Sequence, residues 1–435
     1  MELWGTMKIN DKGHLEIGGC DTISLAQRFG TPLYVMDDTQ IRDACHRYVS
    51  AIRQYGNGMV LYAGKAFTNI AMCKLIQQEG LGLDVVSGGE LYTAMKAEFP
   101  PERIYMHGNN KSYEELRMAV EYGIERVVID SFHEVELLEQ LARNYDKNIG
   151  VSVRVKPGID AHTHHYIKTG QQDSKFGFGI EDGQIYRIIE YILTQPHLEL
   201  KGLHCHIGSQ IFETDPYIET AQIMLELMWD INDTHGLNMD EIDFGGGFGI
   251  RYVEEDNPLA LEDYINALTD GIKAYCDNNA RQYPRILIEP GRSIAGPAGI
   301  TLYTVGAIKR IPDVRTYVSV DGGMADNPRP ALYQAKYSAM IANKADKPAE
   351  CTVSIAGKCC ESGDMLIWDI DLPKVESGDI LAVFDTGAYN YSMASNYNRL
   401  PIPAVVLVKD GRAELMVRRQ SYDDLVSHDC IPSWL

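Results

Sequence analysis

Residues 59–65 form an apolar, β-prone run that ends in a lysine: Met59-Val60-Leu61-Tyr62-Ala63-Gly64-Lys65. The branched and aromatic side chains predict a buried strand. A lysine ammonium is costly to bury without a partner. Lys65 therefore needs solvent, a partner carboxylate, a lowered pKa or a covalent imine with a carbonyl cofactor, and this segment alone leaves these alternatives open.

This run is the first of eight short strand-like segments. They lie at residues 60–63, 82–86, 104–107, 127–130, 149–155, 202–206, 241–244 and 285–289. Amphipathic helical stretches alternate with them, at residues 112–122, 132–145, 217–234 and 261–276. Eight β/α units over about 230 residues are typical of a (β/α)8 TIM-type barrel. Periodicity counts such units without showing that the sheet closes, so a doubly wound open sheet is the alternative.

After Gly291 the pattern changes to short β-rich runs separated by turns that contain Gly, Pro and Asp. The predicted strands are residues 300–311, 316–320, 352–356, 365–370, 380–384, 404–409 and 413–417. We expect a barrel over residues 34–295 and an all-β domain formed by residues 1–33 and 296–435. Short strand-like runs at 7–9, 15–17 and 32–35 complete the second domain.

Composition narrows the classes of partner. The formal net charge of the chain is −21, and no block of basic residues interrupts it, which disfavours nucleic acids and membrane surfaces. No apolar run reaches the length of a membrane span, and residues 1–13 lack the hydrophobic centre of a signal peptide. The nine cysteines are odd in number and form no C-x-x-C pair, which favours a reducing, cytoplasmic setting.

Catalytic residues of a β/α barrel lie at the carboxyl ends of its strands. In this chain nearly every predicted strand ends in polar or glycine-rich residues. They are Lys65, Asp84, His107, Asp130, Arg154, His204, His206, the loop at residues 245–249, Glu289 and Arg292. The sequence therefore predicts one site at the strand ends.

The loop at residues 245–249 contains four glycines and lets backbone N–H groups surround an anion, as phosphate sites after late barrel strands do. A tight structural turn is the alternative, and Ile250 rules out the dinucleotide-binding pattern. The histidines at 162, 164, 165, 204 and 206 raise the question of a metal. No carboxylate or cysteine completes a tetrahedral set with them at a familiar spacing, so we expect no metal site.

A lysine, a phosphate-binding loop, a flat-faced histidine and a carboxylate together suit pyridoxal phosphate. In this interpretation Lys65 forms the imine, and Glu289 keeps the ring nitrogen protonated so that the ring withdraws electrons from the substrate. Such an electron sink supports decarboxylation, racemisation or transamination, and these motifs do not choose between them.

Nine motifs along nearly the whole chain then carry a resemblance to a known family. They lie at residues 62–66, 84–90, 174–177, 206–210, 245–249, 289–292, 329–333, 360–364 and 387–389. Together they resemble the alanine-racemase-fold (fold type III), PLP-dependent amino-acid decarboxylases, most closely those that act on diaminopimelate. The resemblance implies decarboxylation of meso-2,6-diaminopimelate to L-lysine and CO2, the last step of lysine biosynthesis. It also implies a homodimer whose subunits share their active sites.

The resemblance assigns roles residue by residue. Lys65 forms the internal aldimine with pyridoxal 5'-phosphate, and the ring acts as the electron sink. The other implied cofactor contacts are His206 on the ring, Ser209, Gly246, Gly247 and Tyr389 at the phosphate, Glu289 at the ring nitrogen, and Gly291 and Arg292.

The resemblance also implies the substrate contacts. The implied set is Arg292, Arg329, Tyr333 and Tyr389 for the substrate, with Cys360 and Glu361 entering from the neighbouring subunit. Cys360 is the implied acid, and Glu361 binds the distal ammonium of the substrate. Lys358 and Cys359, just before this pair, depart from the small or apolar residues usual in the family.

Ornithine, arginine and carboxynorspermidine decarboxylases are the rival enzymes. Diaminopimelate carries a second carboxylate and a second ammonium, so its distal subsite needs both cations and an anion. Arg292, Arg329 and Glu361 supply this mixture, and ornithine decarboxylases typically carry Cys-Asp in place of Cys360-Glu361.

Two other classes of function remain open. A PLP-binding regulator has no need of the acid Cys360, and a racemase normally places a tyrosine base opposite the lysine.

Overall fold

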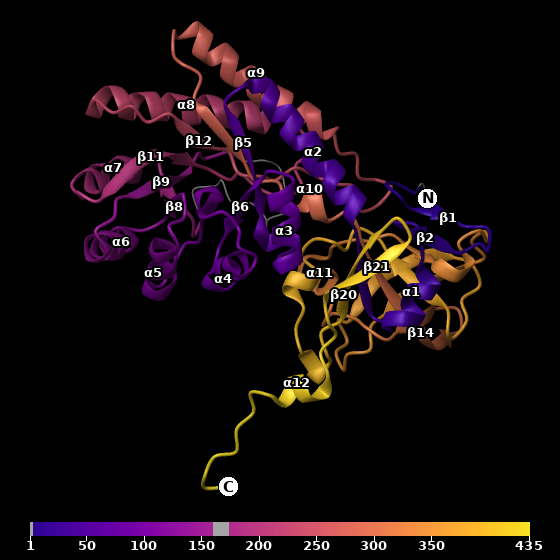
Figure 1. Cartoon of the computed structure of the whole chain (residues 1–435). Helices are drawn as coiled ribbons and strands as arrows, with labels where there is room; N and C mark the ends of the chain where they lie inside the picture. The colour runs from indigo at the N-terminus through magenta and orange to yellow at the C-terminus, as the bar shows by residue number, and fades with distance from the viewer. Residues whose placement is uncertain (1–2, 160–173) are drawn as a thin grey trace. The chain divides into compact units, whose positions relative to one another are not determined.

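The structure is a computed structural model that describes residues 3–159 and 174–435. The predicted histidines at 162, 164 and 165 lie outside these residues. Contacts divide the chain into two units (Figure 1). The barrel unit comprises Asp43–Ile250 and Asn257–Ser293, and the β-rich unit comprises Met1–Arg42, Arg251–Asp256 and Ile294–Leu435.

Eight parallel strands form a ring in the described part of the barrel unit. They are β5 (Gly58–Ala63), β6 (Gly82–Val85), β7 (Ile104–Met106), β8 (Arg126–Ile129), β9 (Ile149–Lys156), β11 (Leu198–His204), β12 (Glu241–Asp243) and β13 (Arg285–Ile288). Each strand pairs with the next, β10 (Phe178–Gly179) adds to β9, and β13 pairs with β5. The ring is therefore closed, which confirms the predicted (β/α)8 barrel and excludes the open sheet.

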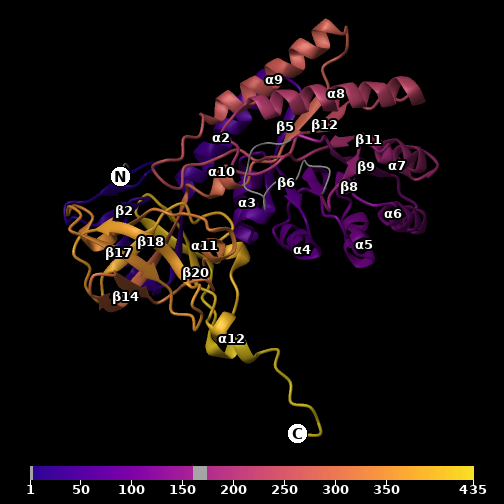
Figure 2. The ribbon, with the colours of Figure 1, turned by 180° about the vertical axis from the view of Figure 1, so that it is seen from behind.

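Helices alternate with these strands. They are α2 (Asp38–Tyr55), α3 (Ile70–Gln78), α4 (Gly88–Lys96), α5 (Tyr113–Tyr122), α6 (Phe132–Tyr145), α7 (Gln184–Leu193), α8 (Asp215–His235), α9 (Leu261–Asn278) and the short α10 (Arg292–Ala295). Helices α4, α5 and α6 follow one another along one edge of the unit in both views (Figures 1 and 2). Serine N-caps at Ser87, Ser112 and Ser131 begin these three helices directly after the strand-end loops. Among the described helices, none combines the length and the apolar character needed to cross a membrane.

An ionic cluster fills the barrel at the amino ends of its strands. Glu241 lies 3.1 Å from Arg126 and 2.7 Å from Arg285, measured from carboxylate oxygen to guanidinium nitrogen. The ring of Tyr105 packs beside them, against Leu61 and Leu287. This end of the barrel is committed to internal pairing, so the polar groups left for chemistry lie at the opposite, carboxyl ends of the strands.

The β-rich unit is built on a mixed sheet. In sheet order its strands are β18 (Met365–Leu372), β17 (Cys351–Ala356), β15 (Arg315–Val320), β14 (Gly299–Ile311), β4 (Leu33–Asp37), β20 (Ala404–Lys409) and β21 (Arg412–Val417). Off this path, β19 (Ile380–Val383) pairs with β14 and with β16 (Ala339–Ile341). A small second sheet contains β1 (Lys8–Ile9), β2 (Leu15–Ile17) and β3 (Cys20–Asp21). The predicted C-terminal strands are confirmed, and β16 was not predicted.

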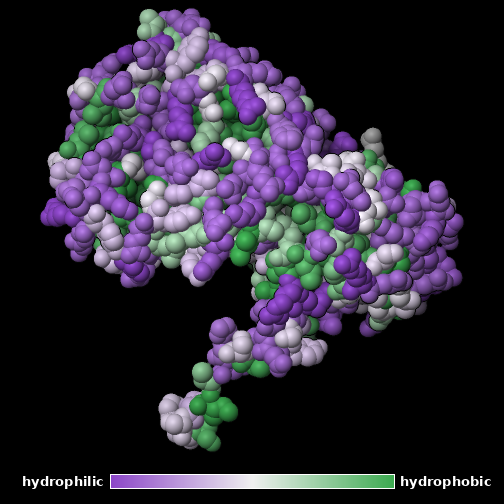
Figure 3. Space-filling model, in the orientation of Figure 1, coloured by the Kyte–Doolittle hydropathy of each residue, from purple (hydrophilic) through white to green (hydrophobic). Residues whose placement is uncertain are grey.

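Strand β4 lies inside this sheet, between β14 and β20, with all five residues buried. It pairs antiparallel with β14 and parallel with β20, so the expected domain boundary at residue 34 falls inside β4. The unit also contains three short helices, α1 (Thr22–Phe29), α11 (Arg329–Tyr333) and α12 (Tyr422–Val426), and is therefore β-rich, not all-β. Beyond α12, the last residues carry exposed apolar side chains, visible as green atoms at the end of the chain in Figure 3.

The ionic cluster gives a test of the barrel's stability. Replacing Glu241 by Gln leaves Arg126 and Arg285 without their shared carboxylate. We expect the free energy of unfolding to fall by about 2–4 kcal/mol, less than for a fully buried pair because Arg285 is partly exposed. The shift of the urea midpoint measures this loss. Glu125→Gln is the control, because Glu125 also pairs with Arg126 but is more exposed, and it should cost less than about 1 kcal/mol. Equal shifts in both variants would contradict the account.

Candidate active site

Lys65 lies directly after β5, in the short 3₁₀ helix Gly64–Ala66, and is half-buried. A Cβ on Gly64 would stand 2.8 Å from the backbone oxygen of Asp84, so the chain can take this path past β6 only with glycine at this position. The charge of Lys65 contributes to the pKa shifts of Asp84, Glu90 and His206. Lys65 therefore lies at the carboxyl ends of the strands, where its charge affects neighbouring groups. This is the position predicted from the sequence.

His206 follows β11, and its Nδ1 accepts the N–H of Gly246 at 3.3 Å. This bond leaves the proton of a neutral ring on Nε2. Burial holds the pKa of His206 well below its usual range, and the charges of Lys65 and Arg154 add to the effect. The residue therefore presents a neutral, flat ring.

The glycine loop after β12 approaches its neighbours too closely for side chains. A Cβ on Gly246 would lie 2.2 Å from the backbone oxygen of Glu289, and one on Gly247 would lie 2.6 Å from that of Gly208. Gly247 also has a φ of +101°, which disfavours other residues. Gln210 fixes the end of this loop, because its amide both donates to and accepts from the Ile250 backbone at 2.9 Å.

Ser209 and Arg292 lie beside this loop. The Nη2 of Arg292 donates to the Ser209 hydroxyl at 2.7 Å, which orients the hydroxyl hydrogen away from the arginine. Gly291, which precedes Arg292, is buried against β5: a Cβ there would lie 2.9 Å from the Cβ of Ala63. A hydroxyl, a guanidinium and glycine N–H groups together have the chemistry of an anion site.

Glu289 lies at the centre of a buried acid–base group, here called the Glu289 cluster: Asp84, His107, His204, Asp243 and Glu289. The Nε2 of His107 is 2.8 Å from Glu289 Oε1 and 3.7 Å from Asp84 Oδ1. The Nε2 of His204 is 3.5 Å from Glu289 Oε2. Every member lies at the carboxyl end of a barrel strand or within one residue of it, and β6 and β7 meet β11, β12 and β13 through the pairing of β13 with β5. The cluster therefore depends on closure of the barrel.

Protonation differs from member to member. Burial lowers the pKa of His204 to about 3, so this ring is neutral. Burial by itself would raise the pKa of Glu289. The contacts with His107 and His204 outweigh this effect and hold the pKa well below its usual range. We attribute this support chiefly to His107, because a neutral His204 at 3.5 Å contributes neither charge nor a good hydrogen bond. Burial raises the pKa of Asp243 well above its usual range, and the nearby Glu289 charge adds to the effect.

Several polar atoms of the Glu289 cluster have no hydrogen-bond partner of good geometry among the described residues. They are Asp84 Oδ1, His107 Nε2, both ring nitrogens of His204, Asp243 Oδ2 and Glu289 Oε1. Leaving a buried polar atom unsatisfied costs about 1–3 kcal/mol. Such a concentration at one end of a barrel marks a place where a polar ligand completes the bonding.

His107, His204, Asp243 and Glu289 can also offer four metal-ligand atoms within 4.8 Å of one another. The sequence argument against a metal relied on the lack of a carboxylate at a familiar spacing, and the closed barrel supplies two carboxylates from other strands. That argument was therefore incomplete. The expectation that no metal binds stays a prediction.

The remaining predicted residues lie in the β-rich unit. Arg329 begins α11 and is buried, Tyr333 ends this helix half-buried, and Tyr389 is half-buried with a left-handed φ of +67°. The centroid of the Tyr389 ring lies 5.9 Å from the Arg329 guanidinium carbon. Arg329 and Tyr389, 60 positions apart in sequence, are thus brought together within this unit.

Cys360 and Glu361 are both exposed, in the loop between β17 and β18. The Asp364 carboxylate organises this loop, because it accepts N–H groups from Cys359 at 2.8 Å and from Met324 at 2.7 Å. Cys359 points into the protein, where burial raises its pKa to about 12. The unusual Cys359 is therefore an internal residue of the loop, and its neighbour Cys360 is the thiol at the surface.

The structure brings the eight predicted residues of the barrel unit to the carboxyl ends of the strands: Lys65, His206, Ser209, Gly246, Gly247, Glu289, Gly291 and Arg292. Sequence reasoning missed His204 and Asp243 as neighbours of Glu289. Their positions as the last residues of β11 and β12 carried the signal.

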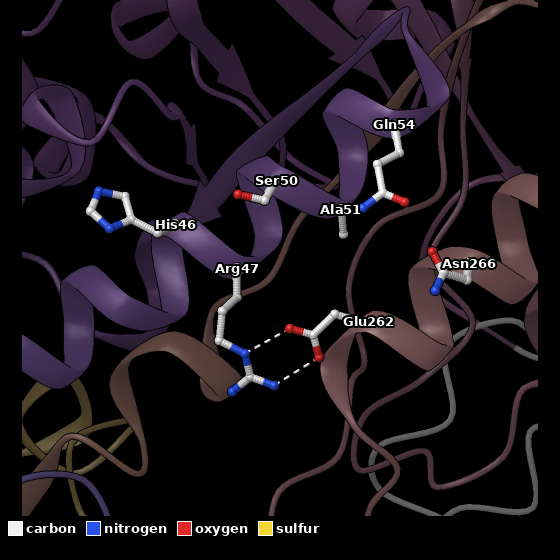
Figure 4. A pocket seen from close by; sticks show the side chains of 7 residues that line it. All are labelled: His46, Arg47, Ser50, Ala51, Gln54, Glu262 and Asn266. Atoms are coloured by element: carbon white, nitrogen blue, oxygen red, sulfur yellow. Dashed lines mark hydrogen bonds and ion pairs between the residues drawn. The ribbon is translucent and has the colours of Figure 1, made fainter.

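A separate pocket of about 250 Å³ lies between α2 and α9 and is lined by His46, Arg47, Ser50, Ala51, Gln54, Glu262 and Asn266 (Figure 4). Arg47 is already paired with Glu262 through two bonds of 2.7 and 2.8 Å. No residue of the strand-end site lines this pocket, so it is distinct from the site described above.

Comparison with known proteins shows the family to which the chain is related. Residues 39–296 match the family model of the pyridoxal-dependent decarboxylases, in its pyridoxal binding domain. The barrel and its strand-end groups thus define an enzyme that uses pyridoxal phosphate. A diaminopimelate decarboxylase of Bacillus subtilis (strain 168) is 54% identical over 430 residues, which are 99% of this chain and 98% of that protein.

Two solved structures are similar over nearly their whole length. The diaminopimelate decarboxylase of M. jannaschii, in complex with L-lysine, has a TM-score of 0.92 and 37% identity and covers 99% of both chains. The Helicobacter pylori enzyme, also with L-lysine, has a TM-score of 0.85 and 31% identity over 94% of this chain and 98% of that one. The chain belongs to the diaminopimelate decarboxylase family.

The Glu289 cluster predicts how stability depends on pH. Burial raises the pKa of Asp84 from 3.8 to about 6, so folding takes up a proton between these values. Proton uptake on folding means that stability is lost as the pH rises through this window. Asp84→Asn removes the loss. With the cofactor stripped, the variant should be more stable than the parent by about 1–3 kcal/mol above pH about 7, and by nearly nothing below pH about 4.

Thermal melts across this pH range measure the difference. Glu262→Gln is the control, because Glu262 is a surface carboxyl whose pKa is lowered by Arg47, and it should give no gain at any pH. A gain for Asp84→Asn that does not change with pH would show that the raised pKa of Asp84 is not its cause.

Proposed function

We propose that this enzyme decarboxylates meso-2,6-diaminopimelate to L-lysine and CO2, the last step of lysine biosynthesis. The observation that carries the choice of substrate is Arg329, which is 7% exposed and has no acidic partner among the described residues. A buried guanidinium of this kind suits a substrate with a second carboxylate. The L-lysine bound in the two solved relatives is the product of the proposed reaction.

The residues at the strand ends fit pyridoxal phosphate. Lys65 would attach the cofactor covalently, and its phosphate would lie at Ser209, Gly246 and Gly247, with the Ser209 hydroxyl and the Gly247 N–H as donors. The close packing of these glycines and the unsatisfied atoms of the Glu289 cluster support this fit. When bound, the cofactor supplies an electron sink for the carbanion that decarboxylation leaves.

The chain's own groups have distinct tasks in this proposal. Glu289, held ionised by His107, keeps a proton on the ring nitrogen. His206 packs on the flat face of the cofactor. Because the histidine ring is neutral, it does not repel the protonated ring of the cofactor. Arg292 orients the Ser209 hydroxyl, and Gly291 lets the chain pass close to β5.

Residues of the β-rich unit complete the proposal. The proposal assigns Arg329, Tyr333 and Tyr389 of this unit to the substrate, together with Arg292 of the barrel unit. Arg329 binds the distal carboxylate of the substrate, and Tyr389 also contacts the cofactor phosphate. Glu361 binds the distal ammonium. Cys360 delivers the proton that replaces the lost carboxylate at the α-carbon. Only a substrate with two amino-acid ends uses both an arginine and a glutamate at its distal end.

The proposed assembly is a homodimer in which Cys360 and Glu361 serve the neighbour's site. Both residues are exposed. Helix α11 and β18 pack together nearby and expose Leu332 (53%) and Trp368 (57%), which a second subunit would cover. The odd number of cysteines, nine, supports a reducing, cytoplasmic setting as part of the same proposal.

Product analysis tests the reaction directly. The purified protein with pyridoxal phosphate should convert meso-diaminopimelate to L-lysine and CO2, identified by mass spectrometry, and should leave ornithine, arginine and carboxynorspermidine unchanged. Borohydride should fix the cofactor on Lys65, and Lys65→Ala should lose nearly all turnover but keep its fold. Turnover of a rival substrate would overturn the choice of diaminopimelate. An adduct on another lysine would overturn the role of Lys65.

Subunit mixing tests the shared site. Lys65→Ala and Cys360→Ala proteins should each have low activity. A hybrid dimer contains one site with neither change, so an equal mixture should recover about a quarter of the native activity. The matched control mixes Lys65→Ala with His206→Ala, which leaves every barrel defective and should recover nothing. No recovery in the first mixture, despite demonstrated subunit exchange, means that Cys360 serves its own subunit or none.

A further inference from the structure

Arg329 is a buried cation that has no carboxylate partner in the described part of the chain. It is the first residue of α11 and 7% exposed, and among the described residues it forms no ion pair. Among the described residues, the guanidinium of Arg329 forms one hydrogen bond, in which Nη1 donates to the hydroxyl of Tyr337 at 2.5 Å. A guanidinium has five N–H donors. Most donors of Arg329 are therefore not used by the described residues.

Aromatic rings surround this guanidinium. Its carbon lies 4.9 Å from the ring centroid of Tyr252, 5.6 Å from that of Tyr337 and 5.9 Å from that of Tyr389. We call these three residues the tyrosine cage. Each ring face attracts the cation, by about 0.5–2 kcal/mol. The rings therefore hold the charge in a low-dielectric place without neutralising it.

Two members of the cage are fixed to each other. Tyr252 and Tyr337 pack edge to face, with centroids 5.3 Å apart and an interplanar angle of 82°. The Ser338 hydroxyl donates to the backbone oxygen of Tyr252 at 2.8 Å, which ties the short segment Arg251–Asp256 to the β-rich unit. The Tyr337 hydroxyl donates to Asn390 Oδ1 at 3.3 Å, and Asn390 is fully buried next to Tyr389. Contacts within the protein thus hold the Tyr252 ring and the Tyr337 hydroxyl in place.

We propose that Tyr252 and Tyr337 are positioning residues that act through Arg329 and make the site select substrates with a second carboxylate. The inference rests on the proposed function and deepens it. The Tyr252 ring fixes the plane of the guanidinium, and the Tyr337 hydroxyl fixes its rotation. A carboxylate then meets two N–H donors already in place, whereas an apolar chain end leaves a buried cation unpaired.

The test compares two acids of equal length on the loaded enzyme. Pimelate has a carboxylate at each end, heptanoate has one, and neither carries the amino group needed for reaction. Calorimetry on the wild-type protein should show that pimelate binds at least about tenfold more tightly. Tyr337→Phe and Tyr252→Leu should each reduce this ratio by about fivefold or more and leave heptanoate binding unchanged. With diaminopimelate as substrate, the same variants should raise KM more than they lower kcat.

Two controls separate positioning from general damage. Tyr252→Phe keeps the ring and should keep most of the ratio. Tyr422→Phe changes a tyrosine that is 79% exposed and should keep all of it. Ratios that stay at the wild-type value in both Tyr337→Phe and Tyr252→Leu would overturn the inference, as would equal weakening of pimelate and heptanoate. If the wild-type protein prefers pimelate but does not decarboxylate diaminopimelate, the proposed function fails and the role of the cage stands.

Discussion

Parallel pairing of the last barrel strand with the first is the contact on which the site depends. In this pairing Val60 of β5 lies opposite Ile288 of β13, and the Ala63 N–H donates to the Pro290 backbone oxygen at 3.2 Å. Closure therefore brings the chain that leads into Lys65 beside the chain that follows Glu289. The other strand ends are fixed in the same ring, so its backbone hydrogen bonds bring His206 and the glycine loop together, and their own side-chain contacts then fix the local geometry.

Closure also forces several ionisable groups out of water at once. The pKa of Glu90 rises to about 7 and that of Asp84 to about 6, chiefly through burial, while Glu289 stays ionised beside His107. An apolar set of side chains would pack there at lower cost. The free energy lost by burying these groups is offset in part when a charged, hydrogen-bonding cofactor binds beside them. The ionic cluster around Glu241, by contrast, is satisfied within the protein and serves stability alone.

Local pattern predicted the elements well, because strand and helix periods are properties of neighbouring residues. All eight barrel strands and most strands of the β-rich unit were found this way, although β16, only three residues long, gave no signal. What the sequence could not supply was distance across the fold. His107 follows β7 and meets Glu289 after β13 only because the barrel closes, and Tyr252 meets Arg329 only because the segment Arg251–Asp256 leaves the barrel unit for the β-rich unit.

Arg292 and Arg329 show why residue type alone does not define a role. The resemblance assigned both to the substrate, and Arg292 to the cofactor as well. In the structure Arg292 donates to the Ser209 hydroxyl, whereas Arg329 lies among tyrosine rings with no acidic partner among the described residues. An arginine that orients a neighbouring hydroxyl is tied to the part of the site that this hydroxyl serves. An arginine held only by π faces and one phenol keeps its charge available for an incoming anion. In the proposed function, Arg292 therefore supports cofactor binding first and Arg329 decides which substrate is accepted.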